Sequence, residues 1–357
     1  MTTGQSLAEG AAGVALLHLE TGDRMAAFTA LEEAAADGVT IADNASLYYG
    51  SPAFGFVLAT SSWPELARAR AVAADGTAAV TRRKLEAANR RIDQRRRPDY
   101  AEYDLIRGLT GLGVALRRIG NLDLLHDVLT YLVRLTEPMG SLPGWWCRNG
   151  PSRDQPDPAG GHSNHGLAHG ITGPLSLLAL THLDGLHVDG QTDAISRVLS
   201  WLDIWEQQTI AGSVWWPQTL IRTDLERGAL VQRGPGRPSW CYGTPGIARA
   251  LQLAARAVGD TARQRRVETA FTACISDPAQ TGRFIDRGLC HGTAGLLATS
   301  RRIAADALAP ISLEHLQTLH HTTATANEPA GLLDGRAGAE LAVTGTTTAW
   351  DALLLLC

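Results

Sequence analysis

The chain has 357 residues with a formal net charge of −4, and 45% of them are hydrophobic while 19% are charged. A chain of this length and composition buries a substantial core and is not disordered. Its acidic balance gives no electrostatic basis for binding nucleic acid. The first ten residues lack the features of a signal peptide, and no apolar stretch reaches the length of a transmembrane segment. We therefore expect a cytoplasmic protein.

An internal repeat organises the sequence. A Gly-x-x-Gly motif opens an Ala- and Leu-rich segment with helical spacing, which is followed by a break and then by a second amphipathic segment. This pattern predicts seven helical hairpins in a mainly helical protein. The motif occurs at Gly10–Gly13, Gly108–Gly111, Gly170–Gly173, Gly243–Gly246, Gly292–Gly295 and Gly335–Gly338, with a looser copy at Gly50.

Helical hairpins can stack into an open solenoid or close into a ring. The first helices are small and apolar, which suits a crowded inner layer, whereas the second helices carry Arg and Glu on one face, as an outer layer would. An open solenoid also needs polar caps, yet the sequence finishes with the apolar AWDALLLLC, which predicts a last hairpin buried against the first. We therefore predict an all-α fold, a closed α/α toroid with seven inner and seven outer helices, over a single domain of residues 1–357.

The residue just before the first glycine of each copy is ionisable or aromatic. In a closed ring the inner helices run parallel, so these residues converge at one end, where the helix N-termini favour anions and lower the pKa of a cysteine. We call this end the rim of the barrel. The seven residues are Glu9, Tyr49, Arg107, His169, Tyr242, His291 and Asp334.

Cys241 and Cys290 each lie one residue earlier in their copies, and His291 follows Cys290 directly. Two thiolates and one imidazole form a zinc ligand set with one position left open, as in catalytic zinc sites. Five cysteines in a cytoplasmic chain also favour metal or catalytic use over a disulfide framework. The alternative is that cysteine serves there as a small hydrophobic residue. Cys147, Cys274 and Cys357 are assigned no role.

A second candidate metal site consists of His162, His165 and His169, which are spaced three and four residues apart. The glycines among them argue against one helical face, so we expect His162 and His165 on a mobile loop near the rim. They end an irregular loop at about 138–165. Trp145 and Trp146 in this loop look exposed, and they either contact a peptide or cover the end of the barrel.

Four segments, SWCYGTPGIARAL, LCHGTAGLL, GLAHGITGPLSLL and YDLIRGLTGLGVAL, resemble the signature blocks of the lanthionine synthetase C-like family. This family contains the cyclases that form thioether rings in lanthipeptides, and the resemblance covers nearly the whole chain. It implies an α/α toroid with zinc held by Cys241, Cys290 and His291. It also implies that His169 and Asp104 are active-site residues and that Arg237 contributes.

The chemistry suited to such a zinc is conjugate addition of a cysteine thiol to dehydroalanine or dehydrobutyrine, because zinc keeps a bound thiolate nucleophilic. The resulting enolate must be protonated, and His169 is the expected general acid. Asp104 either orients that imidazole, helps to deprotonate the thiol, or caps a helix. Arg237 and Arg107 are candidates for stabilising the enolate. Tyr242 either supports the site or simply packs.

Two other functions stay open at this point: a different zinc-thiolate alkylating enzyme on a similar barrel, such as a protein prenyltransferase, and a non-catalytic scaffold that binds a precursor peptide. The near absence of lysine argues against a diphosphate pocket and so against the prenyltransferase. We expect a stand-alone cyclase that acts on a dehydrated precursor peptide beside a separate dehydratase. Membership of a membrane-associated biosynthetic complex stays open.

Overall fold

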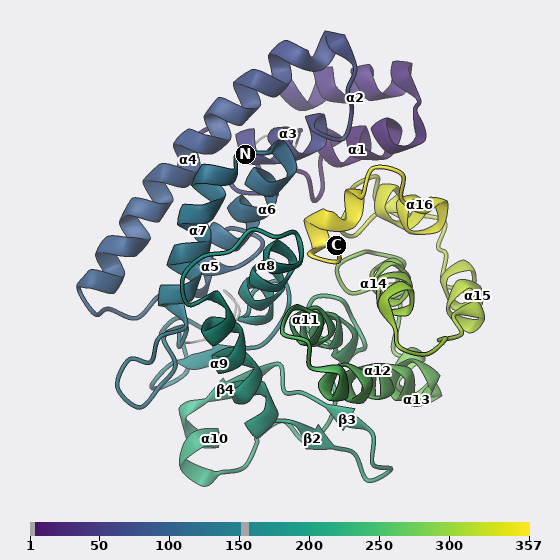
Figure 1. Cartoon of the computed structure of the whole chain (residues 1–357). Helices are drawn as coiled ribbons and strands as arrows, with labels where there is room; N and C mark the ends of the chain where they lie inside the picture. Colours follow the sequence, from purple (N-terminus) through teal and green to yellow (C-terminus); the bar gives the residue numbers. More distant parts are fainter. Residues whose placement is uncertain (1–3, 151–156) are drawn as a thin grey trace.

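The computed structural model describes residues 4–150 and 157–357. Seven helices form a closed inner ring, in which each helix contacts the next and the last contacts the first (Figure 1). The predicted α/α toroid is therefore confirmed. The inner helices are α1 (Ala11–Thr21), α3 (Ser51–Leu58), α6 (Leu109–Ile119), α8 (Thr172–Leu183), α11 (Thr244–Ala257), α14 (Thr293–Asp306) and α16 (Arg336–Thr344).

Six further helices pack outside the ring, each against the inner helix that precedes it in the chain. In three hairpins a left-handed glycine ends the inner helix, and the next residue, Asp23, Asn121 or Asp260, caps the outer helix by accepting a backbone N–H. The outer helices are α2 (Arg24–Ala35), α4 (Ala67–Asp93), α7 (Leu122–Leu135), α9 (Gln191–Ile204), α12 (Thr261–Ser276) and α15 (Glu314–Thr322).

The remaining elements are short. They are the 3-10 helices η1 (Pro64–Leu66) and η2 (Trp350–Leu354), the helices α5 (Tyr100–Tyr103), α10 (Arg222–Arg227) and α13 (Pro278–Thr281), and the strands β1 (His162–Asn164), β2 (Gln207–Gln208), β3 (Val214–Trp215) and β4 (Thr219–Ile221). Strand β1 pairs antiparallel with β4, and β2 with β3.

The second glycine of the repeated motif lets each inner helix pack directly on the loop that leads into it. A Cβ atom at Gly246 would lie 1.9 Å from the carbonyl oxygen of Trp240. A Cβ at Gly295 would lie 1.9 Å from that of Leu289. Any side chain at these positions would force the loop away from its helix. The motif therefore fixes the loop that carries the rim residues.

The C-terminal residues occupy the middle of the ring instead of forming a seventh outer helix (Figure 1). Here the structure differs from the predicted last hairpin. We call residues 353–357 the tail. Side chains from several repeats donate hydrogen bonds to the backbone carbonyl groups of the tail, which compensates for the burial of these polar groups. The donors are Tyr48 Oη to Leu353 O (2.9 Å), Trp240 Nε1 to Leu354 O (2.9 Å), Arg249 Nη2 to Leu356 O (2.6 Å) and Arg117 Nη1 to Cys357 O (2.8 Å).

Substitution of Leu354 by Ala should therefore destabilise the fold strongly. Leu354 is 0% exposed, and a Leu-to-Ala cavity in a core costs about 2–5 kcal/mol. The free energy of unfolding, measured by urea denaturation, reports the loss. Leu308→Ala is the matched control because Leu308 is 46% exposed, and we expect it to change stability by less than about 0.5 kcal/mol. Equal effects of the two variants would contradict a buried tail.

The irregular segment before α8 is folded more tightly than its sequence indicates. Trp145 and Trp146 are 2% and 1% exposed, so the prediction that they are exposed is wrong. Their indole N–H groups donate to Ser163 Oγ and to the carbonyl oxygen of Gly160, and these bonds permit their burial. Residues 151–156 of the same loop lie outside the described residues.

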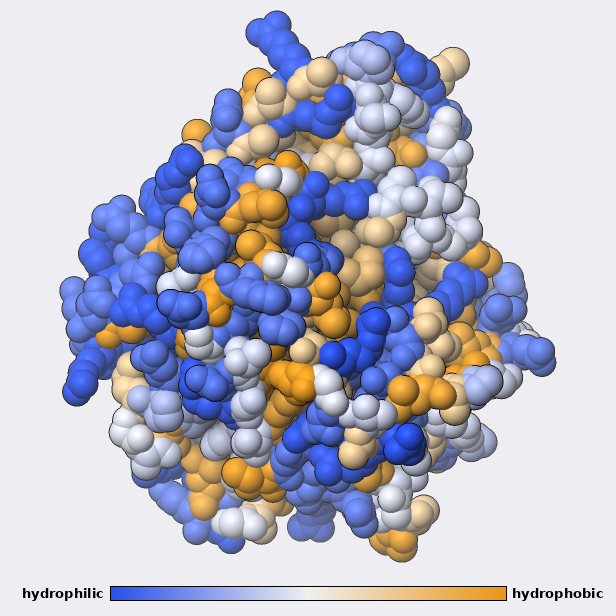
Figure 2. Space-filling view, in the orientation of Figure 1, coloured by the Kyte–Doolittle hydropathy of each residue, from blue (hydrophilic) through white to orange (hydrophobic). Residues whose placement is uncertain are grey.

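The face of the molecule seen in Figure 2 is mostly polar. Hydrophilic residues cover most of the face seen in Figure 2, with hydrophobic residues in small groups between them. Among the described residues, no helix combines the length and the apolar composition that a bilayer crossing requires.

Candidate metal and catalytic site

A belt of backbone hydrogen bonds links the loops before the inner helices and gathers the rim residues of successive repeats. In most links, an N–H just before the rim position donates to the equivalent carbonyl of another repeat. The belt consists of Leu105 N to Ala168 O (3.1 Å), Ala168 N to Cys241 O (3.3 Å), Cys241 N to Cys290 O (3.2 Å), Cys290 N to Leu333 O (3.0 Å), Leu333 N to Ala8 O (2.9 Å) and Leu7 N to Tyr48 O (2.9 Å).

The belt brings the three predicted metal ligands together. One ligand atom from each of Cys241, Cys290 and His291 lies within 4.8 Å of the others. Two sulfurs and an imidazole nitrogen at this spacing suit a soft, tetrahedral cation such as zinc. A hydrogen bond between the sulfurs lowers the pKa of Cys241 to about 7 and, together with burial, raises that of Cys290. Cys241 is therefore the thiol that loses its proton more easily, and metal binding would displace the protons that remain on the pair.

Two carboxylates flank the imidazole of His291. Asp286 Oδ2 lies 3.8 Å from its Nε2, and Asp334 Oδ1 lies 3.8 Å from its Nδ1. Whichever nitrogen binds a metal, the other has a carboxylate beside it, an arrangement that commonly fixes the tautomer of a metal-binding histidine. Asp334 was predicted at the rim by the repeat, and burial raises its pKa. Asp286 was not predicted.

Asp104 orients His169. The Asp104 side chain is 0% exposed, and its Oδ2 lies 2.7 Å from His169 Nδ1. Its Oδ1 accepts the backbone N–H groups of Arg107 and Gly108, each at 2.7 Å. Asp104 thus caps the turn into α6 and holds the imidazole at once, so two of the roles left open by the sequence coexist. The side chain of His169 is 27% exposed, and its Nε2 forms no hydrogen bond with the described residues.

Two aromatic rings stand beside His169. The ring centroid of Tyr242 lies 6.2 Å from that of His169, and the centroid of Tyr100 lies 5.6 Å away in an edge-on arrangement. Tyr242 Oη accepts a hydrogen bond of 2.9 Å from Asn164 Nδ2. Tyr242 therefore lies beside His169 and forms a polar contact there, which favours a supporting role over simple packing.

Asn164 and Asp286 are the site residues that the sequence analysis missed. Both lie six residues before the first glycine of their copies, and Arg237 occupies the same position in its own copy. The position six residues before the first glycine therefore holds a polar residue in these three copies, and the repeat could have identified it as a second candidate site position.

The two candidate arginines are not fixed at the site. Arg237 is partly exposed, and its side chain forms no hydrogen bond within the part of the chain that the structure describes. The backbone carbonyl of Arg107 accepts a hydrogen bond of 2.9 Å from Lys84 Nζ, which anchors its loop.

The alternative three-histidine site does not form in the described residues, where the one candidate metal cluster is the cysteine and histidine set. His162 and His165 are both 0% exposed, so their prediction as mobile loop residues is wrong. His165 is held on both sides: Trp201 Nε1 donates to its Nε2, and its Nδ1 lies 3.0 Å from the carbonyl oxygen of Pro217. Strand pairing of β1 with β4 encloses this segment.

The burial of His165 predicts a loss of stability in acid. Burial lowers its pKa from 6.5 to about 4, and a proton on Nε2 would also oppose the Trp201 N–H. Between these two pH values the unfolded chain binds more protons than the folded chain, so stability falls as the pH falls from about 6.5 to about 4. The full effect is up to about 3 kcal/mol.

Urea denaturation at pH 7.5 and at pH 5 tests this prediction. We expect His165→Asn to be less stable than the wild type at pH 7.5, and the difference to shrink at pH 5 because Asn has no proton to gain. A difference that stays constant across this range would contradict the assignment.

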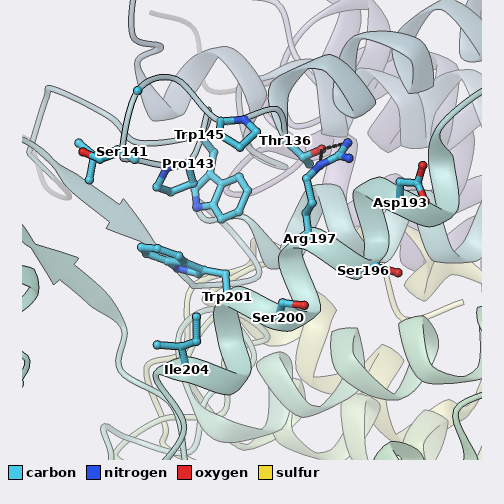
Figure 3. Close-up of a pocket in the computed structure, with 13 residues that line it drawn as sticks. Thr136, Ser141, Pro143, Trp145, Asp193, Ser196, Arg197, Ser200, Trp201 and Ile204 are labelled. Atoms are coloured by element: carbon cyan, nitrogen blue, oxygen red, sulfur yellow. Dashed lines mark hydrogen bonds between the residues drawn. The ribbon is translucent and has the colours of Figure 1, made fainter.

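A groove of about 560 Å³ lies outside the barrel wall, between the loop after α7 and one face of α9 (Figure 3). Trp201 and Trp145 line it, and Arg197 donates two hydrogen bonds to Thr136 Oγ1 along its edge. The lining includes neither the cysteine and histidine cluster nor His169, so the groove is separate from the candidate site.

Comparisons with known proteins agree with this architecture. The family model for lanthionine synthetase C-like proteins matches residues 2–344. Nisin biosynthesis protein NisC of Lactococcus lactis subsp. lactis is 24% identical over 203 residues, which are 55% of this chain and 48% of that protein. The matched region therefore spans about half the length of this relative. A solved structure of nisin cyclase superposes with a TM-score of 0.83 at 19% identity, covering 100% of this chain and 93% of the other. The chain belongs to the lanthionine synthetase C-like protein family.

Proposed function

We propose that residues 1–357 act as one zinc-dependent cyclase domain that forms lanthionine and methyllanthionine rings in a dehydrated precursor peptide. The observation that carries the proposal is the joint placement, at one rim, of a soft metal ligand set and a histidine held by a buried carboxylate. The first suits thiol activation, and the second suits proton delivery.

Cys241, Cys290 and His291 would hold the zinc ion, which when bound lowers the pKa of a substrate thiol and keeps the thiolate nucleophilic. Three protein ligands leave one coordination position open, as catalytic zinc sites do. Asp286 and Asp334 would orient His291 toward the metal through its second nitrogen.

The reaction adds a thiol across a carbon–carbon double bond. The sulfur forms a bond to the β-carbon of the dehydroamino acid, and the electron pair of the double bond moves to the adjacent carbonyl as an enolate. A proton then adds to the α-carbon, so the thiol proton is replaced by a C–H bond and nothing leaves. His169 Nε2 would deliver this proton while Asp104 holds Nδ1. Arg237 and the hydroxyl of Tyr242 are the candidates for stabilising the enolate oxygen.

The test uses a synthetic peptide that contains one cysteine and one dehydrobutyrine. Ring closure leaves the peptide mass unchanged, so the readout is the disappearance of the thiol that an alkylating reagent would otherwise cap. We expect capping to be lost in the presence of the zinc-loaded protein and retained without it. Peptide binding with full retention of the thiol would favour the scaffold function and contradict the cyclase.

The proposal also implies a separate enzyme. Dehydroamino acids arise when serine or threonine loses water, whereas the chemistry at this site joins two groups and removes nothing. We infer that a dehydratase supplies the substrate peptide.

A further inference from the structure

The side chain of Asn164 is fully buried in strand β1 and binds two groups. Its Oδ1 accepts the backbone N–H of Gly166 at 3.0 Å, and its Nδ2 donates to Tyr242 Oη at 2.9 Å. A backbone N–H can only donate, so the amide oxygen must face Gly166 and the NH₂ group must face the tyrosine. The orientation of the amide is therefore fixed by its neighbours.

This orientation decides what the hydroxyl of Tyr242 can do. Because Oη already accepts a hydrogen bond from Asn164, the hydroxyl hydrogen is directed elsewhere, and the described residues contain no acceptor for it. A tyrosine hydroxyl ordinarily keeps its hydrogen at neutral pH, so Oη can still donate a hydrogen bond. The phenol is thus a hydrogen-bond donor without an internal acceptor.

The same segment fixes the ring. A Cβ at Gly166 would lie 2.6 Å from Tyr242 Cδ1, so the glycine leaves just enough room for the phenol to lie against the backbone. The ring is seated by Gly166 and its hydroxyl is held by Asn164. The centroid of this ring lies 6.2 Å from that of His169, so the phenol ring lies beside the proposed proton donor at the rim.

We propose that Asn164 is a positioning residue that makes Tyr242 donate its hydroxyl hydrogen to the enolate oxygen formed during ring closure. The inference rests on the proposed cyclase function and deepens it. Asn164 itself does not touch the substrate. Its NH₂ group donates a hydrogen bond to the tyrosine oxygen, so the hydroxyl hydrogen is left to donate to the substrate.

Asn164→Asp is the sharpest test, because aspartate keeps the size of the side chain and the acceptor for Gly166 but loses the NH₂ donor. The Tyr242 hydroxyl would then donate to the carboxylate and turn away from the substrate. We expect the rate of ring closure at saturating peptide to fall about 10²- to 10³-fold, as on removal of an oxyanion donor, with KM little changed. Tyr242→Phe should give a loss of similar size.

The double variant separates positioning from a purely structural role. We expect Asn164→Asp combined with Tyr242→Phe to be no slower than the slower single variant, because both remove the same hydrogen bond. Ser163→Ala is the control on the same strand: it removes the acceptor of the Trp145 N–H but should leave the rate within about 2-fold of the wild type.

The wild type in the same assay tests the proposed function separately. Absence of ring closure by the wild type contradicts the cyclase. An active wild type with an equally fast Asn164→Asp variant contradicts the role of Asn164, and so do multiplicative losses in the double variant. Thermal melting of each variant establishes that the rates compare folded proteins.

Discussion

Cys290→Ala should reduce the zinc content of the purified chain from about one ion to almost none and abolish ring closure. Among the described residues the cluster has three protein ligands within 4.8 Å of one another, so the variant would keep one thiolate and one imidazole. Two ligands do not make the three-residue set of a catalytic zinc site, and the thiol of the substrate would lose its activation. Elemental mass spectrometry after dialysis gives the zinc content, and thiol capping of the dehydrated peptide gives the activity.

Cys274→Ala is the matched control. Cys274 lies in α12, is 1% exposed, and its thiol donates a hydrogen bond to Gln280 Oε1. Among the described residues it belongs to no candidate metal cluster. Its removal should leave both zinc content and ring closure unchanged. Two results would contradict the proposal: one zinc per chain retained by Cys290→Ala, which places the metal elsewhere, or ring closure that continues without zinc.

Substitution of His169 by Ala should lower the rate of ring closure by about 10²- to 10⁴-fold while the zinc content stays at about one. This range is the usual contribution of a general acid or base. Since His169 lies outside the metal cluster, its loss should remove proton delivery but not metal binding. The rate is measured by single-turnover capping experiments, so that peptide binding and chemistry are separated.

Asp104→Asn tests the hydrogen-bonded pair of His169 and Asp104 through its other member. The introduced asparagine would keep an acceptor for the turn into α6 but would no longer present a carboxylate to His169 Nδ1, so we expect a loss similar to that of His169→Ala. The double variant should be no worse than either single one. His126→Ala, on the exposed face of α7, is the control and should be neutral. A zinc-loaded His169→Ala protein with wild-type rate would exclude this histidine as the proton donor.

Much of this molecule can be predicted from its repeat. The second glycine of each motif reports a backbone contact too close for any side chain, so the recurrence of glycine marks where each inner helix begins. The rim position follows from the same register, and it predicts that Cys241, Cys290 and His291 lie near one another, as they do. A local requirement repeated in six copies gives a signal that a single site in an irregular fold does not.

The sequence by itself determined the toroid, the rim and the residue types gathered there, because each of these depends on spacing within one repeat. Tertiary structure alone decided what depends on contacts between repeats. The tail fills the ring because donors from four distant positions satisfy its carbonyl groups. His165 is buried because Trp201 and Pro217 complete its hydrogen bonds. Asn164 reaches Tyr242 across 78 positions of the chain. Such partners are adjacent only once the ring has closed, since local periodicity carries no information about which polar group will meet another across the barrel.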